Sequence, residues 1–286
     1  MGNSLYSIRQ AVGRMMGSGD IIIVTGTPAA TFSTSGFTCG TLALEDSDYY
    51  NDWWLRFYLG THKDTTRRVT AFTTTTGAVV FSPVVTGAVD ATDLFELHRD
   101  FSPEEINNAI NLAIQMIETE YLEEKSDATL AVIANTYEYA VPTGFAWIDE
   151  IYQEQSNADL YSSSDLIDRR FWKIIDKAGT KYIWFESAYI TGVGDPYSQT
   201  FGLTTGRNLR LVGQGKPSTL TLDAETTNVP MAYLVQQTKA LLHQQRIDEV
   251  SSSSVSGRQD SQMQIAQRMA DREREKLFST PRGWKV

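Results

Sequence analysis

The spacing of apolar residues along the chain changes from a helical to a strand period within the first hundred residues. From Ser4 to Met16 the apolar residues recur at helical spacing, which predicts a short amphipathic helix within residues 1–20. Residues 21–98 are rich in Thr, Val and aromatic residues and alternate apolar with polar positions, as strands do. We therefore predict a small antiparallel β-barrel or β-sandwich over residues 21–98.

A strongly specified helix follows this β module. Ser102 can cap the first turn, Pro103 suits the first helical position, and Glu105 completes a capping box three residues after the cap. We place this core helix in residues 99–127 and expect it to reach about Lys125. Its apolar face would consist of Ile106, Ala109, Ile110, Ala113, Ile117 and Tyr121.

The rest of the chain alternates again between the two patterns. Residues 128–227 contain several short apolar and aromatic runs separated by polar stretches, which predicts a β-rich domain with long loops. Pro230 suits the first turn of a second core helix within residues 228–250. Residues 251–286 combine a Ser-rich flexible connector, a charged helix with few apolar residues and a short tail. The fold class is therefore α+β.

The composition excludes several classes of function but does not identify a particular function. The chain has 286 residues, of which 41% are hydrophobic, so it can bury a substantial core. Cys39 is its single cysteine, which excludes an internal disulfide framework. A formal net charge of −10 disfavours general binding to nucleic-acid phosphate. No apolar run approaches the roughly 20 residues that span a bilayer, so we expect no membrane partner.

Motifs for catalysis and cofactor binding do not assemble in this sequence. The three histidines, His62, His98 and His243, have no companions at metal-ligand spacing. The segment from Gly213 to Lys216 evokes a phosphate-binding loop, but the next residue is a proline where such a loop needs Ser or Thr. We therefore expect no catalytic residue, no metal, no cofactor and no enzymatic activity.

Aromatic residues cluster near residue 50 of the β module. Tyr49, Tyr50, Trp53 and Trp54 could form a platform that stacks on sugar rings. Alternation along a strand instead favours burying part of this set in the core or an interface, which is the interpretation we prefer.

The local residue sequences of these segments, and their order along the chain, resemble those of a known protein family. A β module that ends in Phe95-Glu96-Leu97, followed by Ser102-Pro-Glu-Glu-Ile106 and a helix rich in Asn, Ala and Ile, resembles the head-to-tail adaptor, or neck, proteins of tailed bacteriophages. The resemblance covers most of the chain. It implies a bundle-like helical adaptor core, in which the two β-rich regions are insertions larger than a minimal adaptor needs. It also implies a non-catalytic role in the virion neck after assembly in the host cytoplasm.

The resemblance also implies partners. Such adaptors form a ring, commonly of about twelve copies, beneath the portal, and they extend the channel through which double-stranded DNA passes without sequence-specific binding. Further partners would be tail, stopper or fibre proteins. For portal docking the resemblance points to the carboxy-terminal region, where our leading contacts are Arg268, Arg272, Leu277, Phe278 and Trp284. For packing between subunits we select the apolar helix residues Ile106, Ile110, Ile117, Met263 and Met269.

Two alternatives stay open at the level of sequence. The chain could be a peripheral virion binding module, such as a collar, fibre-anchor or decoration protein, that recognises glycan or other virion proteins. It could also be a polysaccharide-cleaving enzyme that uses acidic residues on the β scaffold, although no catalytic motif supports this.

Overall fold

The chain forms two compact units in a computed structural model that describes residues 2–16, 23–30, 32–156, 160–186, 203–249 and 255–279. Unit 1 comprises Met1–Ile117 and Ser218–Val286, and unit 2 comprises Glu118–Pro217. The second unit is thus inserted into the first between a helix and the segment that leads to the next helix.

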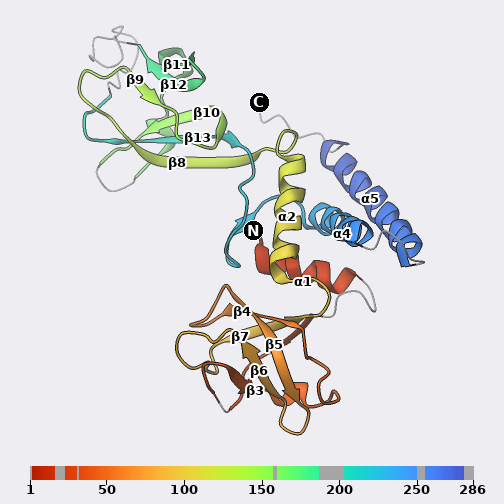
Figure 1. The fold of residues 1–286 in the computed structure, drawn as a ribbon. Helices are drawn as coiled ribbons and strands as arrows, with labels where there is room; N and C mark the ends of the chain where they lie inside the picture. Colours follow the sequence, from red (N-terminus) through yellow and green to blue (C-terminus); the bar gives the residue numbers. More distant parts are fainter. Residues whose placement is uncertain are drawn as a thin grey trace. The chain divides into compact units, whose positions relative to one another are not determined.

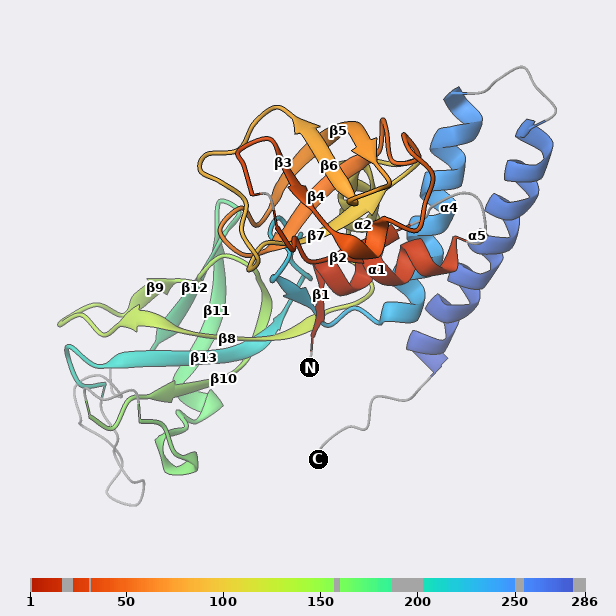
Figure 2. The same cartoon turned by 90° about the horizontal axis from the view of Figure 1, so that it is seen from below.

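Four α-helices of unit 1 lie in the described residues: α1 (Leu5–Met15), α2 (Pro103–Ile117), α4 (Met231–Glu249) and α5 (Val255–Ser279). Both α1 and α2 pack against α4, and α5 runs beside α4 in Figure 1 and Figure 2. The predicted capping box is present, since Ser102 N donates to Glu105 Oε2 (2.6 Å) and Glu105 N donates to Ser102 Oγ (3.1 Å). This reciprocal pair satisfies two backbone donors at the start of α2.

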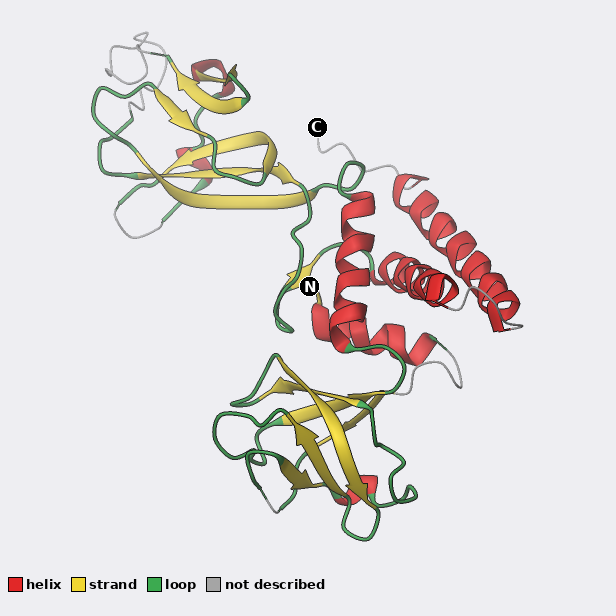
Figure 3. Cartoon of the chain, viewed as in Figure 1, coloured by secondary structure: helices red, strands yellow, loops and turns green. Residues whose placement is uncertain are grey.

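The β module of unit 1 is a curled half-barrel, and its strands are yellow in Figure 3, as are all strands of the chain. Its six strands are antiparallel to their neighbours and follow the order β2-β7-β4-β5-β6-β3. Their bounds are β2 Ile23–Gly26, β3 Gly36–Thr38, β4 Trp54–Leu59, β5 Thr65–Thr73, β6 Ala78–Ser82 and β7 Leu94–His98. A short strand β1 (Asn3–Ser4) pairs with β14 (Thr226–Thr227) outside this sheet.

Aromatic rings fill the interior of the β module. Tyr50 and Trp53 are buried and pack edge to face with ring centroids 5.0 Å apart, whereas Tyr49 lies at the rim. Two of the four aromatic residues near residue 50 are therefore core, and Trp54 is half-buried, which agrees with the partial burial expected from alternation. Gly77 turns the chain with φ +63°, and a Cβ there would lie 2.1 Å from the carbonyl oxygen of Cys39, so this turn requires glycine.

Unit 2 consists of two three-stranded antiparallel sheets around its own core. One has the order β10-β13-β8 and the other the order β11-β12-β9. Their strands are β8 Glu123–Ala131, β9 Glu138–Ala140, β10 Phe145–Gln153, β11 Trp172–Lys177, β12 Thr180–Phe185 and β13 Asn208–Gly215. The core includes Ile151, Ile183, Phe185, Leu209 and Leu211, each of which is completely buried.

The structure confirms the mixture of helices and antiparallel sheets and corrects one boundary. The sequence predicted the α2 helix to continue to about Lys125, but the helix ends at Ile117 and β8 begins at Glu123. Glu118 and Glu120 follow the last turn, where negative charge opposes the helix dipole. Pairing of β8 with β13 then satisfies the backbone groups on one side of Glu123–Ala131, a segment with little strand character of its own.

Candidate functional site

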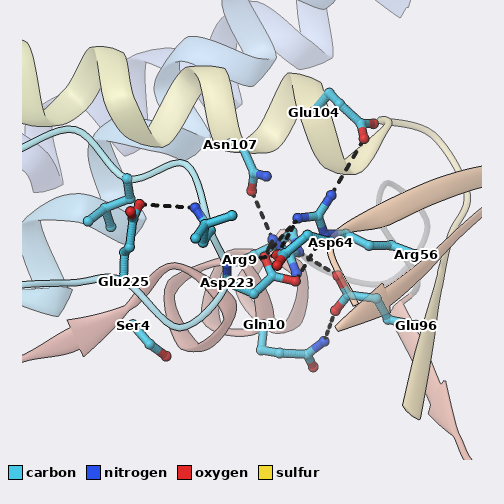
Figure 4. A network of polar contacts seen from close by, with 12 residues as sticks. Ser4, Arg9, Gln10, Arg56, Asp64, Glu96, Glu104, Asn107, Asp223 and Glu225 are labelled. Atoms are coloured by element: carbon cyan, nitrogen blue, oxygen red, sulfur yellow. Dashed lines mark hydrogen bonds and ion pairs between the residues drawn. The ribbon is translucent and has the colours of Figure 1, made fainter. Parts of the chain in front are cut away.

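A buried group of charges joins α1 to the β module. Arg9 of α1 is completely buried although it is charged; its Nε donates to Glu96 Oε1 of β7 (2.5 Å). The Nη1 atom of Arg9 donates to Asp223 Oδ1 (2.8 Å) and to Asn107 Oδ1 of α2 (2.9 Å). Figure 4 shows these side chains converging from the helix, the sheet and the segment before β14. One guanidinium therefore links four separate parts of unit 1.

Arg56 of β4 completes the group from the opposite side of Asp223. Its Nε and Nη2 donate to the two carboxylate oxygens of Asp223 at 3.0 Å each, which is the bidentate geometry that arginine favours. Arg56 also lies 3.2 Å from Asp64 and 3.6 Å from Glu104 at the start of α2. We call Arg9, Arg56, Glu96 and Asp223 the ion cluster.

Within the ion cluster two arginines pair with two buried carboxylates, and Asp64 and Glu104 add contacts to Arg56. Burial by itself raises the pKa of Glu96, but the charges of His98 and Arg9 and the hydrogen bonds that Glu96 accepts lower it to about 2. Glu96 is therefore ionised at neutral pH. Since all four charges are paired within the protein, the arrangement suits holding elements together rather than binding or transforming a substrate.

A second feature of unit 1 is an open groove between three helices. It has a volume of about 730 Å³, and its walls come from Arg14 and Met15 of α1 and from Met269 and Arg272 of α5. Val235 of α4 lies among the lining residues between these walls. Lys239 of α4 donates to the carbonyl oxygen of Met15 (2.8 Å), which ties the end of α1 to α4. We call this the methionine groove, because Met15, Met231 and Met269 line it.

Helix α5 presents its apolar residues in an unusual way. The small residues Ala266 and Ala270 are buried, whereas the larger Ile265 and Met269 are 53% and 49% exposed. Two alanines four residues apart lie on one face of a helix, so α5 packs closely along α4. The bulky apolar groups of α5 are thereby left on the surface, where apolar side chains that gather on one face mark an interaction site.

The residues predicted for subunit packing fall into two groups. Ile106, Ile110 and Ile117 are completely buried inside unit 1, so their side chains have no surface to offer to a second copy. Met263 is half-buried on α5, and Met269 lines the methionine groove. Sequence reasoning missed the exposed apolar residues of α2, Leu112 and Met116, which flank the predicted apolar face.

The residues predicted for portal docking are only partly described. Arg268 and Arg272 are exposed on α5, and Leu277 is half-buried near its end. Trp284 and the side chain of Phe278 lie outside the described residues. The structure brings Arg272 to the same groove as Met269, although the sequence had assigned these two residues to different partners.

The described residues offer no metal centre, because none of their His, Cys, Asp and Glu side chains form a group that could hold an ion. All three histidines, His62, His98 and His243, are buried. His62 Nδ1 lies 2.8 Å from Asp93 Oδ2, and its Nε2 lies 3.1 Å from the carbonyl oxygen of Thr86, so this histidine ties two loops of the β module together. None of the described helices is long and apolar enough to cross a membrane.

Comparison with known protein families assigns the chain to one of them. The profile of the SU10 adaptor protein family matches residues 86–283. The chain belongs to this family. No curated protein matches it. Membership in the SU10 adaptor protein family identifies a structural adaptor of the phage virion that interacts with other virion proteins.

The matched range covers only part of the ion cluster. It includes β7, α2, unit 2, α4 and α5, but it leaves out α1 and the strands β2 to β6. In the ion cluster, Glu96 and Asp223 thus come from the matched part, whereas Arg9 and Arg56 come from the part before it. The cluster fastens α1 and β4, which lie before the matched range, to residues within it.

Proposed function

We propose that this SU10-type adaptor is a head-to-tail connector that forms a ring beneath the portal, joins the phage head to the tail and extends the DNA channel. The observation that carries the proposal is the family match, which runs through α2, α4 and α5. These helices would be the bundle-like core of the ring, and further contacts would reach tail, stopper or fibre proteins. The ring would contain about twelve copies.

Surface features of the helices support an assembled state. Leu112, Met116, Ile265 and Met269 are between 46% and 53% exposed on α2 and α5. Covering them would remove apolar surface from water, which is the main favourable term in association. The net charge of −10 is consistent with a channel wall that does not hold passing DNA.

Portal docking would use the outer side of α5 and the tail that follows it. Arg268 is exposed on α5 and is absent from the lining of the methionine groove, so it is free to contact a different partner from Met269. Arginine is enriched among residues that dominate binding energy in interfaces. Leu277 and, by prediction, Phe278 and Trp284 would extend this contact beyond the helix.

The test is electron microscopy of the purified chain with and without the portal protein of the same phage. Deleting all of α5 would uncover α4, so the informative variants are Arg268→Glu and a chain that ends at Ser279. We expect the full-length chain to stack as a ring on the portal, and both variants to form rings that no longer stack. A folded full-length chain that ignores the portal and binds a fibre protein or a surface glycan would favour the peripheral binding module.

A further inference from the structure

The methionine groove is an apolar surface with basic edges in an acidic protein. Arg14 and Arg272 stand on its two walls, and neither has an ion-pair partner among the described residues. The third charged lining residue, Glu273, is already paired with Lys276. Methionine side chains adapt to irregular partners and are common on binding surfaces. The groove therefore suits a partner with apolar side chains between carboxylates.

Helix α2 offers that chemistry on the same unit. Leu112 and Met116 lie one turn apart and are 46% and 47% exposed. The helix has Glu104 and Glu105 in its first turn and no basic residue from Pro103 to Ile117. We call Leu112, Met116 and the exposed Asn108 between Leu112 and Glu104 the α2 stripe. The stripe itself is uncharged, but the acidic first turn of α2 precedes it, and Glu104 is 51% exposed although it lies 3.6 Å from Arg56. Bulky apolar groups beside negative charge are the complement of the groove.

We propose that the methionine groove of one copy receives the α2 stripe of a second copy. The proposal rests on the function proposed above and specifies which surfaces meet between neighbours. Groove and stripe are different surfaces of one chain, so each copy has one of each to offer. Such a contact is heterologous, and it produces closed rings or open filaments instead of symmetric dimers.

This contact explains two features that the isolated chain leaves without a role. The outward position of Met269, with alanines facing α4, supplies the groove with its apolar wall. The two arginines of the groove gain acidic neighbours from α2. Charge complementarity of this kind mainly sets the orientation and specificity of association. Arg272 accordingly acts between copies, whereas portal docking stays with Arg268 and the tail.

The test uses two variants that each spoil one surface, Leu112→Asp on the stripe and Met269→Asp in the groove. Both side chains are about half exposed, so the aspartates can be solvated in the folded monomer. We expect each variant alone to associate at least about 30-fold more weakly than the wild type, as for loss of an interface hot spot. Leu44→Asp is the matched control, since Leu44 is an apolar residue that is 90% exposed on the β module.

Mixing the two variants gives the decisive result in native mass spectrometry and sedimentation. The Met269→Asp chain keeps an intact stripe, and the Leu112→Asp chain keeps an intact groove, so one good contact forms between them. We expect a one-to-one heterodimer that grows no further, while the wild type and Leu44→Asp form larger closed assemblies.

Three results would overturn the inference: a wild type that stays monomeric at every attainable concentration, variants that assemble like the wild type, or a mixture that stays monomeric. Failure of the connector function gives a different pattern. In that case the wild type oligomerises and the mixture forms heterodimers, but no assembly binds the portal.

Discussion

Replacing Glu96 with glutamine tests whether the ion cluster stabilises unit 1 as its geometry indicates. Glu96 is completely buried and accepts hydrogen bonds from Arg9 and Gln10, while His98 Nε2 lies 3.0 Å away. Glutamine keeps the size of the side chain but removes its charge. Arg9 then retains Asp223 as its single anionic partner, and Asp223 is shared with Arg56.

The magnitude follows from the pKa of Glu96. Its ordinary value is 4.5, and in the folded protein it is about 2. A difference of roughly 2.5 corresponds to about 3 kcal/mol, since each pKa unit represents about 1.36 kcal/mol. Breaking a buried ion pair typically costs about 3–5 kcal/mol, so the two estimates agree. At neutral pH we expect Glu96→Gln to lower the free energy of unfolding by about 3 kcal/mol.

The effect has a defined pH dependence. Because the folded pKa lies below the unfolded one, the ionised carboxylate stabilises the fold fully above pH 4.5, and this contribution is lost as pH falls towards 2. Protonated Glu96 resembles glutamine in charge. The stability difference between wild type and Glu96→Gln should therefore shrink from about 3 kcal/mol at neutral pH towards zero near pH 2.

The assay is urea unfolding followed by fluorine NMR of fluorotryptophan-labelled protein. Trp53 is buried in the β module, so its signal reports unit 1 separately from the tryptophans of unit 2. Glu104→Gln is the control, because Glu104 lies 3.6 Å from Arg56 but its side chain is 51% exposed. Exposed pairs contribute at most about 1 kcal/mol. Equal losses for both variants, or a Glu96→Gln effect that does not change with pH, would refute the reasoning.

Three further substitutions test other contacts of unit 1. Ser102→Ala removes the hydroxyl that caps α2, so the free energy of unfolding measured in urea should fall by about 1 kcal/mol. An unchanged midpoint of urea unfolding would show that the cap does not stabilise the fold. Asp93→Asn weakens the buried hydrogen bonds that the Asp93 carboxylate makes with His62, which should cost about 2 kcal/mol in the same assay; a cost no larger than that of the cap would contradict the pairing. Ala270→Leu overfills the contact between α4 and α5 and should cost about 1–3 kcal/mol with faster amide exchange in both helices. Met269→Leu, at the exposed neighbouring position, should leave exchange in the monomer unchanged.

Local sequence signals predicted the elements whose structure depends on residues close together in the chain. The capping box at Ser102 and Glu105 predicted the start of α2, because its hydrogen bonds connect residues three positions apart. The end of the same helix was not predictable in this way. Strand β8 exists because β13, more than eighty residues later in the chain, pairs with it, and no local pattern in Glu123–Ala131 reveals that partner.

The candidate sites were predictable to a smaller degree. Arg9 carried one usable signal, since it lies one turn after Leu5 and beside Ile8 on the apolar face of its helix, where an isolated charge needs a buried partner. Which partner it finds depends on Glu96 and Asp223, which are 87 and 214 residues away. The exposed position of Met269 likewise follows from the packing of alanines against α4, which helical spacing alone does not decide.

The ion cluster and the methionine groove together bear on how a ring would carry its β modules. A single hydrogen-bonded contact would leave the β module free to swing about α1. Arg9 and Arg56 instead reach Asp223 from a helix and from a strand, and Asp223 accepts from both. Buried charges of this kind are costly to separate, so the alternative orientations are disfavoured even though the net stabilisation is modest. In the proposed ring, helices that contact neighbouring copies would therefore set the orientation of every β module, and a change in Glu96 would loosen that orientation while leaving the methionine groove intact.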